Sequence, residues 1–307
     1  MKVEGRRESS NIRDQRGGVA KKAAAGVGGG GMILAVIIYM LTGQNVAPQL
    51  AQTQAQSQQC VGAECQVDTQ AADSNTKGQA YQTGEFKNEG ELKKFVSVIL
   101  ASTEDVWNQV FKENGLQYHE PSLTLFSQAV DTGCGHADYN AGPFYCSADK
   151  SVFIDLNFLA DMSKTLGAGG DFAYAYVIAH EVGHHVQNEL GYLVKYGSQE
   201  QMLRKSGKEE EANFISVQTE LQADCFGGVW ANREGKKYNS ISDADIAKGI
   251  NAARAVGDDK LGVKRRENFG HGSAEMRMKW LKRGLTTGDI KQCDTRVYTT
   301  LDQLQNI

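Results

Sequence analysis

The chain has 307 residues, of which 40% are hydrophobic and 23% charged, and its formal net charge is −4 at pH 7. This apolar content is sufficient for one folded domain of roughly 200 residues with additional segments. A pI near 5.9 argues against a nucleic-acid partner, because such partners bind clustered basic surfaces. The sequence has no repeat at a solenoid or propeller period, so repeat architectures are excluded as well.

The first 43 residues have the pattern of a membrane anchor. Residues 1–22 are basic, with seven Lys and Arg against three acidic residues, and residues 23–43 carry no charge. The apolar centre from Met32 to Leu41 favours a transmembrane helix over 23–43, with a cleaved signal peptide and a soluble buried helix as alternatives. The positive-inside rule then places residues 1–22 in the cytoplasm and the following residues on the periplasmic side of the inner (cytoplasmic) membrane, as a single-pass protein.

Residues 44–84 have the composition of a disordered linker. Glutamine, alanine, serine and threonine dominate this stretch, and large apolar residues are almost absent, so it cannot form a core. Cys60 and Cys65 lie within it with no histidine nearby, which favours a small disulfide loop over a metal site.

The folded domain is expected over residues 85–307, and the alternation of helical and strand patterns predicts an α+β fold with a small sheet. The first elements, in chain order, are one long helix or two short ones from 92 to 114, a strand at 123–127, a turn at 131–135, a hairpin of 143–146 with 151–155, a helix at 156–166 and a central apolar helix at 173–187.

The central helix contains the pattern H-E-x-x-H, with histidines at positions 180 and 184 and Glu181 between them. Residues four apart lie on one face of a helix, so His180 and His184 can bind one metal ion. Glu181 can then reach a water molecule beside the ion and accept its proton. The alternative is a core helix with two hydrogen-bonded histidines and no metal.

A third ligand is expected on the next helix, predicted over 209–231. The metzincin arrangement is excluded, because it needs glycine and histidine where this chain has Gln187 and Leu190. Glu220 and Asp224 lie four residues apart among apolar residues, where unpaired acids are costly. We therefore predict Glu220 as the third zinc ligand and Asp224 as the group that orients a ligand histidine. A solvated acidic face is the alternative.

Several segments together carry a family resemblance: Glu4–Arg7, Asp14–Gly17, Gly142–Cys146 with Asp149, Ala179–Gln187, Glu220–Cys225, His271–Ser273 and Cys293–Thr295. The ligand pattern resembles that of gluzincin metallopeptidases, and the chain resembles the bacterial neutral zinc metallopeptidases of the YpfJ type over nearly its whole length except the linker. The resemblance implies a membrane-anchored zincin-like domain, mainly helical with a small sheet, that binds one Zn²⁺ per chain. Ser147 and Ala148 stand where the family pattern has a proline, which affects a turn and not the site.

The other histidines have different expected roles. His271 lies between two glycines at the start of a helix expected over 273–283. In gluzincins a late histidine stabilises the oxyanion, so the resemblance implies a catalytic role for His271 beside Glu181, with a surface histidine as the alternative. His185 is expected in the core or next to the ligands, and His119 and His136 are expected to be structural.

Four cysteines in the domain are candidates for two disulfides. Cys134 and Cys146 flank the turn and hairpin before the central helix, and Cys225 and Cys293 would tie the C-terminal region to the ligand helix. Such bridges persist only outside the cytoplasm, in agreement with the expected orientation. Reduced, buried thiols, or one thiol bound to zinc, are the alternatives.

Together these features predict a membrane-anchored zinc peptidase that hydrolyses peptide bonds in a peptide or protein substrate. A zinc-stabilised binding or assembly module of the cell envelope, without turnover, is the alternative from another class. Glu181 favours the enzyme, because a purely structural zinc site has no use for a carboxylate beside its ligands. An interaction protein without metal would leave the pairing of Glu220 and Asp224 unexplained.

Overall fold

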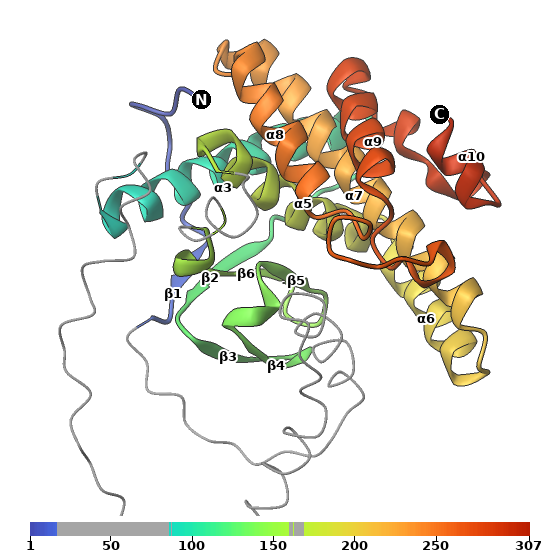
Figure 1. Ribbon diagram of the computed structural model, residues 1–307. Coiled ribbons are helices and arrows are strands. Elements are labelled where there is room, and N and C mark those ends of the chain that lie inside the picture. The colour runs from blue at the N-terminus through green and yellow to red at the C-terminus, as the bar shows by residue number, and fades with distance from the viewer. Residues whose placement is uncertain (17–85, 87, 160–161, 163–168) are drawn as a thin grey trace, which may run out of the picture.

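The computed structural model describes residues 1–16, 86, 88–159, 162 and 169–307. The helices are α3 Glu89–Glu113, α5 Asp171–Glu189, α6 Tyr192–Lys205, α7 Glu209–Tyr238, α8 Asp243–Ala255, α9 Ala274–Thr287 and α10 Leu301–Gln305. The strands are β1 Ile12–Asp14, β2 Ser122–Phe126, β3 Ala129–Thr132, β4 Gly135–Asp138, β5 Phe144–Cys146 and β6 Ser151–Asp155. Short 3₁₀ turns are η1 Tyr139–Ala141, η2 Arg266–Asn268, η3 Ile290–Cys293 and η4 Thr295–Val297. A mainly helical domain with a small sheet is therefore confirmed (Figure 1).

The main sheet has four strands in the order β1-β2-β6-β5. Strands β1, β2 and β6 are parallel, and β5 pairs with β6 as the antiparallel edge strand of the expected hairpin. Leu123 and Val152 are paired and belong to the main core, whereas Phe153 packs in a second, smaller cluster on the other face. The segment expected to be only a turn forms a separate antiparallel sheet of β3 and β4.

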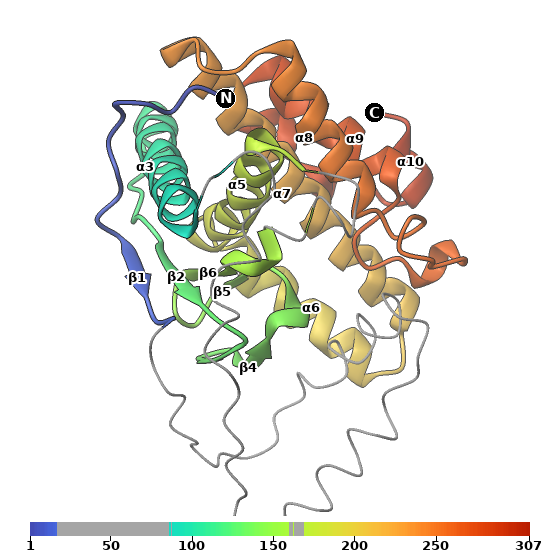
Figure 2. The ribbon, with the colours of Figure 1, turned by 60° about the vertical axis from the view of Figure 1, so that its left-hand side comes forward.

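The helices stack against one another beside the sheet (Figures 1 and 2). The segment before β2 is one continuous helix, α3, with the side chain of Asn88 as its N-terminal cap and Asn114 as its C-terminal cap. α7 packs between α5 and α9. A Cβ atom on Gly284 would lie 2.0 Å from the carbonyl oxygen of Cys225, so glycine allows the backbones of α7 and α9 to touch.

The N-terminal residues 1–16 belong to the folded domain, which corrects the expectation of a separate basic segment over 1–22. Ile12–Asp14 is the β1 strand and pairs in parallel with Leu123–Leu125 of β2. In Figure 2 this segment runs along α3 before it reaches the sheet. The short strand was missed because its partner lies more than a hundred residues away in the sequence.

Both candidate disulfides are confirmed. Cys134 is bonded to Cys146, and Cys225 is bonded to Cys293. The first bridge joins the turn between β3 and β4 to the edge strand β5. The second joins α7 to η3, so the C-terminal region is covalently fixed to the helix that contains Glu220.

The expected membrane helix over 23–43 and the linker over 44–84 lie outside the described residues. Among the residues that are described, no helix is long and apolar enough to cross a membrane. Most of the helix expected at 156–166 also lies outside them, as residues 160–161 and 163–166 are not described.

Candidate metal centre

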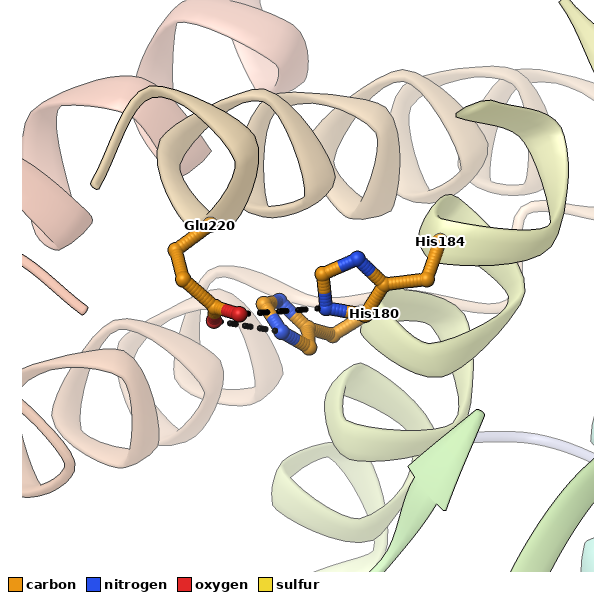
Figure 3. A group of neighbouring side chains, drawn as sticks. All are labelled: His180, His184 and Glu220. Carbon is orange, nitrogen blue, oxygen red and sulfur yellow. Dashed lines mark ion pairs between the residues drawn. The ribbon is translucent and has the colours of Figure 1, made fainter. Parts of the chain in front are cut away.

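The three predicted ligands come together where α5 and α7 cross (Figure 3). His180 and His184 lie on successive turns of α5, and Glu220 reaches toward them from α7. Gly183 makes this approach possible, because a Cβ atom there would lie 2.9 Å from the carbonyl oxygen of Ala223 on α7. A bulkier residue between the two histidines would therefore push the helix of Glu220 away.

The spacing of the donor atoms fits a tetrahedral zinc ion. The Nε2 atoms of His180 and His184 lie 3.3 Å and 3.4 Å from the two carboxylate oxygens of Glu220. Two donors bound at about 2.0–2.1 Å to a tetrahedral ion are themselves separated by about 3.3–3.4 Å. One ligand atom from each residue lies within 4.8 Å of the other two. The residues therefore match zinc in donor type, number and spacing.

The second nitrogen of each imidazole is fixed by a hydrogen bond to an acceptor. His180 Nδ1 donates to Asp224 Oδ1 at 2.8 Å, and His184 Nδ1 donates to Gln187 Oε1 at 2.9 Å. These bonds place the proton on Nδ1 and leave the Nε2 lone pair of each ring free for a metal. Asp224 thus has the orienting position that was predicted for it, whereas Gln187 was not anticipated as a partner.

A buried arginine completes the support of His180 and was missed from the sequence. Arg277 on α9 donates to both oxygens of Asp224, at 2.8 Å and 2.9 Å. Tyr176 also donates to Asp224, at 2.6 Å. Burial by itself would raise the pKa of Asp224, but Arg277 and His180 hold the pKa at about 2. The carboxylate is consequently ionised and correctly placed at neutral pH.

The groups around Glu220 favour its ionised carboxylate. Burial opposes ionisation, but His184 and His180 keep the pKa of Glu220 well below its usual value. Arg277 adds to this field, since its guanidinium lies 3.8 Å from a Glu220 oxygen. In this ionised form the carboxylate can bind a divalent cation.

Glu181 is buried next to the cluster, with 8% of its surface exposed. Burial raises the pKa of Glu181, against the opposing effect of His180 and His184. Among the described residues its carboxylate has no hydrogen-bond partner. A buried carboxylate next to a cation site and free of protein partners is suited to receive a proton from water.

His271 is held by the buried carboxylate of Asp258. The backbone N–H groups of His271 and Gly272 donate to Asp258 Oδ2 at 2.7 Å and 2.8 Å, and His271 Nδ1 lies 3.2 Å from Asp258 Oδ1. Burial would lower the pKa of His271, but Asp258 and the charge of Glu220 raise it. A Cβ atom on Gly272 would lie 3.3 Å from Val217 and Leu221 of α7, so the loop of His271 lies against the helix of Glu220. Asp258 was not identified from the sequence.

The remaining histidines lie elsewhere. His185 is fully buried between Tyr145 of β5, at 2.9 Å, and the carbonyl oxygen of His119, at 2.6 Å. His185 therefore connects α5 to the edge strand β5, in line with its expected place in the core. His119 and His136 are exposed and pair with Glu189 and Asp131.

Comparison with known proteins agrees with this geometry. Residues 1–296 match the family model described as "Putative neutral zinc metallopeptidase". The chain belongs to this zinc metallopeptidase family. It is 38% identical over 317 aligned residues to the uncharacterized protein YpfJ of Escherichia coli K12, covering 96% of this chain and 98% of YpfJ. It is also 38% identical over 230 aligned residues to the uncharacterized protein Rv2575 of Mycobacterium tuberculosis H37Rv, covering 70% of this chain and 75% of that relative. No solved structure matches the chain.

Proposed function

We propose that the protein is a peptidase that binds one zinc ion per chain through His180, His184 and Glu220. The observation that carries this proposal is the 3.3 Å and 3.4 Å spacing between the imidazole Nε2 atoms and the Glu220 oxygens, which suits a tetrahedral ion. Three protein ligands leave a fourth position open, as in catalytic rather than structural zinc sites. The family to which the chain belongs has the same metal in its description.

Zinc, when bound, supplies a Lewis acid that lowers the pKa of a coordinated water. The protein's own contribution to hydrolysis is a base for that proton, and Glu181 is the residue suited to it. Its carboxylate is buried beside His180 and His184 and has no hydrogen-bond partner among the described residues. After attack on the peptide carbonyl, the same carboxyl group is placed to pass the proton to the departing amine.

His271 is the proposed donor to the oxygen of the peptide carbonyl as negative charge develops on it. Asp258 fixes the ring through Nδ1, which leaves Nε2 as the nitrogen available to a substrate. The raised pKa of His271 favours the protonated ring, which is the form that donates most strongly. The side chain of His271 is 43% exposed, whereas that of Asp258 is buried. The imidazole is therefore accessible to a substrate, while the carboxylate that holds it is shielded from solvent.

The proposed substrate is a peptide or an unstructured protein segment, and the proposed location of the domain is outside the cytoplasm. The two disulfides support this location, because such bonds persist in oxidising compartments. Anchoring to the membrane through residues 23–43 remains an expectation from the sequence.

The test is metal-dependent cleavage by the full chain. Purified protein should contain close to one zinc per chain and should cleave an unstructured substrate such as casein. A chelator should abolish cleavage, and added zinc should restore it. Protein that holds zinc but cleaves no casein and no member of a peptide library would support a zinc-stabilised binding module instead. Protein without zinc, or cleavage insensitive to chelators, would contradict the proposal.

A further inference from the structure

The N-terminal segment, residues 1–16, docks on the domain through backbone hydrogen bonds along most of its length. Lys2 N donates to the carbonyl oxygen of Ser240 at 3.0 Å, and Ser9 N donates to that of Ser97 at 3.1 Å. β1 then pairs with β2, and Gln15 N donates to the carbonyl oxygen of Leu125 at 2.8 Å. The segment therefore contacts the region after α7, then α3, then the sheet.

The segment also neutralises two carboxylates that are buried in the helical layer. Glu234 of α7 is fully buried and forms a two-pronged ion pair with Arg6, whose NH2 lies 3.1 Å from Glu234 Oε2. Glu104 of α3 is 1% exposed, and Arg7 NH1 lies 2.8 Å from its Oε2. No other arginine or lysine among the described residues forms an ion pair with either carboxylate.

Hydroxyl and amide groups donate further hydrogen bonds to both carboxylates. Ser9 donates to Glu104, and so does Asn11 through its side-chain amide at 2.9 Å. Ser102 of α3 and Ser240 donate to Glu234. A buried carboxylate that loses its cation is strongly destabilising, so residues 88–307 without the segment would contain two such groups.

The N-terminal segment contacts α7, one of the two helices that form the candidate metal centre. Glu234 lies on α7, the helix of Glu220 and Asp224. Ser102, which donates to Glu234, also accepts a hydrogen bond from the indole of Trp230 at 2.9 Å. Arg6, Glu234, Ser102 and Trp230 thus join the N-terminal segment, α7 and α3 in one buried polar network.

We infer that residues 1–16 are a structural part of the domain and occupy the same compartment as residues 88–307. A chain that crossed the bilayer once, over residues 23–43, would put these two parts on opposite sides. The docked segment and the single-pass topology with a cytoplasmic N-terminus therefore exclude each other. The inference rests on the ion pairs and strand pairing of the segment and is independent of whether the protein is a peptidase.

Cysteine labelling in cells tests the compartment directly. In a full-length background with Cys60 and Cys65 replaced by serine, Ser10→Cys reports on the segment and Gln201→Cys reports on α6, both positions being exposed. Spheroplasts would be treated with a membrane-impermeant maleimide before and after lysis. Both cysteines should be labelled before lysis, or both only after it. One labelled in intact spheroplasts and the other only after lysis would overturn the inference.

A double-mutant cycle on the purified full chain tests the docking itself. Arg6→Met and Glu234→Gln should each lower Tm, by roughly 10 °C for Arg6→Met, and the double mutant should lose much less than the sum of the two. Arg13→Met is the matched control, because Arg13 is exposed on β1 and has no ion pair with a described residue, and it should change Tm by only about 2 °C. Arg6→Lys replaces Arg6→Met if that variant does not fold. Additive effects, or a Tm unchanged by either Arg6 variant, would overturn the inference.

Discussion

Arg277 and Asp224 form a buried ion pair that contacts His180, a proposed zinc ligand. Arg277 Nε lies 2.8 Å from Asp224 Oδ2, and their side chains are 5% and 0% exposed. Asp224 Oδ1 accepts the Nδ1–H of His180, so α9 fixes the orientation of a ligand on α5 through an acid on α7. Three helices thereby determine the position of one imidazole.

Because of this ion pair, we predict that Arg277 increases the affinity of the site for zinc. Arg277→Met should weaken zinc binding by roughly 10–100-fold, because the carboxylate that orients His180 loses its partner. It should also destabilise the fold by about 3–5 kcal/mol, since Asp224 remains buried without its cation. Competition with a zinc-chelating dye measures the first effect, and denaturant unfolding measures the second. Lys282→Met, at an exposed position of the same helix, should leave zinc affinity unchanged. Wild-type zinc affinity in Arg277→Met would contradict the positioning role.

Glu220 and Asp224 are predicted to have different roles although they are one helical turn apart. Glu220→Ala removes a direct ligand, so the zinc content of the purified protein should fall well below one per chain. Asp224→Asn keeps a hydrogen-bond acceptor for His180 and should retain zinc with lower affinity. Elemental analysis after dialysis against buffer distinguishes the two. Full zinc occupancy in Glu220→Ala would move the third ligand to another residue.

His271 is predicted to act on turnover and not on metal binding. His271→Ala should lower kcat by about 10²–10³-fold with zinc content unchanged, because a donor to the developing oxyanion is lost. Asp258→Asn should give a smaller loss, since the ring keeps an acceptor for Nδ1 but not a charge. Steady-state kinetics on a peptide substrate, beside zinc analysis of the same samples, checks this. An unchanged kcat in His271→Ala would show that this histidine has no role in catalysis.

Glu189 gives the fold a predictable pH dependence. Its side chain is 6% exposed at the end of α5, and its oxygens contact Lys150 at 2.9 Å and His119 at 2.7 Å. Burial opposes ionisation, but these two partners lower the pKa of Glu189 from its usual 4.5. A lowered pKa means that the stabilisation is complete above about pH 4.5 and is lost as the pH falls through the lower value of the folded state.

The comparison of wild type with Glu189→Gln tests this dependence. Wild type should be more stable by about 1 kcal/mol near neutral pH, a modest value because Lys150 and His119 are exposed. The difference should shrink steadily in acid and vanish only below the folded-state pKa. Urea unfolding at several pH values measures it. A difference of constant size between neutral pH and about pH 3 would show that the stabilisation has another origin.

The sequence was most informative where chemistry and periodicity agree. The spacing of His180 and His184 requires a helix, and their flanking apolar residues require that it be buried, so the position of the motif followed directly. Glu220 followed from a simple cost argument, because an acid on a buried helix face needs a cation. These signals are local, within a few turns of one helix.

What the sequence did not reveal depends on partners far apart in the chain. Arg277 lies 53 residues from Asp224 and looks like one polar residue on an amphipathic helix, although Met276 and Trp280 beside it are buried. β1 is three residues long and pairs with residues beyond position 120. α6 has no buried residue, so it has little apolar periodicity to detect. α8 did have a local signal, the capping box of Ser242 and Asp245, which was overlooked.

The most direct test of the proposed peptidase is Glu181→Gln, measured for zinc content and for cleavage of casein on the same preparation. The variant should hold as much zinc as wild type and retain its fold, because Glu181 is not a ligand and has no hydrogen-bond partner among the described residues. Its kcat should fall by roughly 10³-fold or more, since the base that takes the proton from water is gone. Glu210→Gln, an exposed glutamate on α7, is the control and should keep full activity. Cleavage within tenfold of wild type by Glu181→Gln, with zinc bound, would contradict the account.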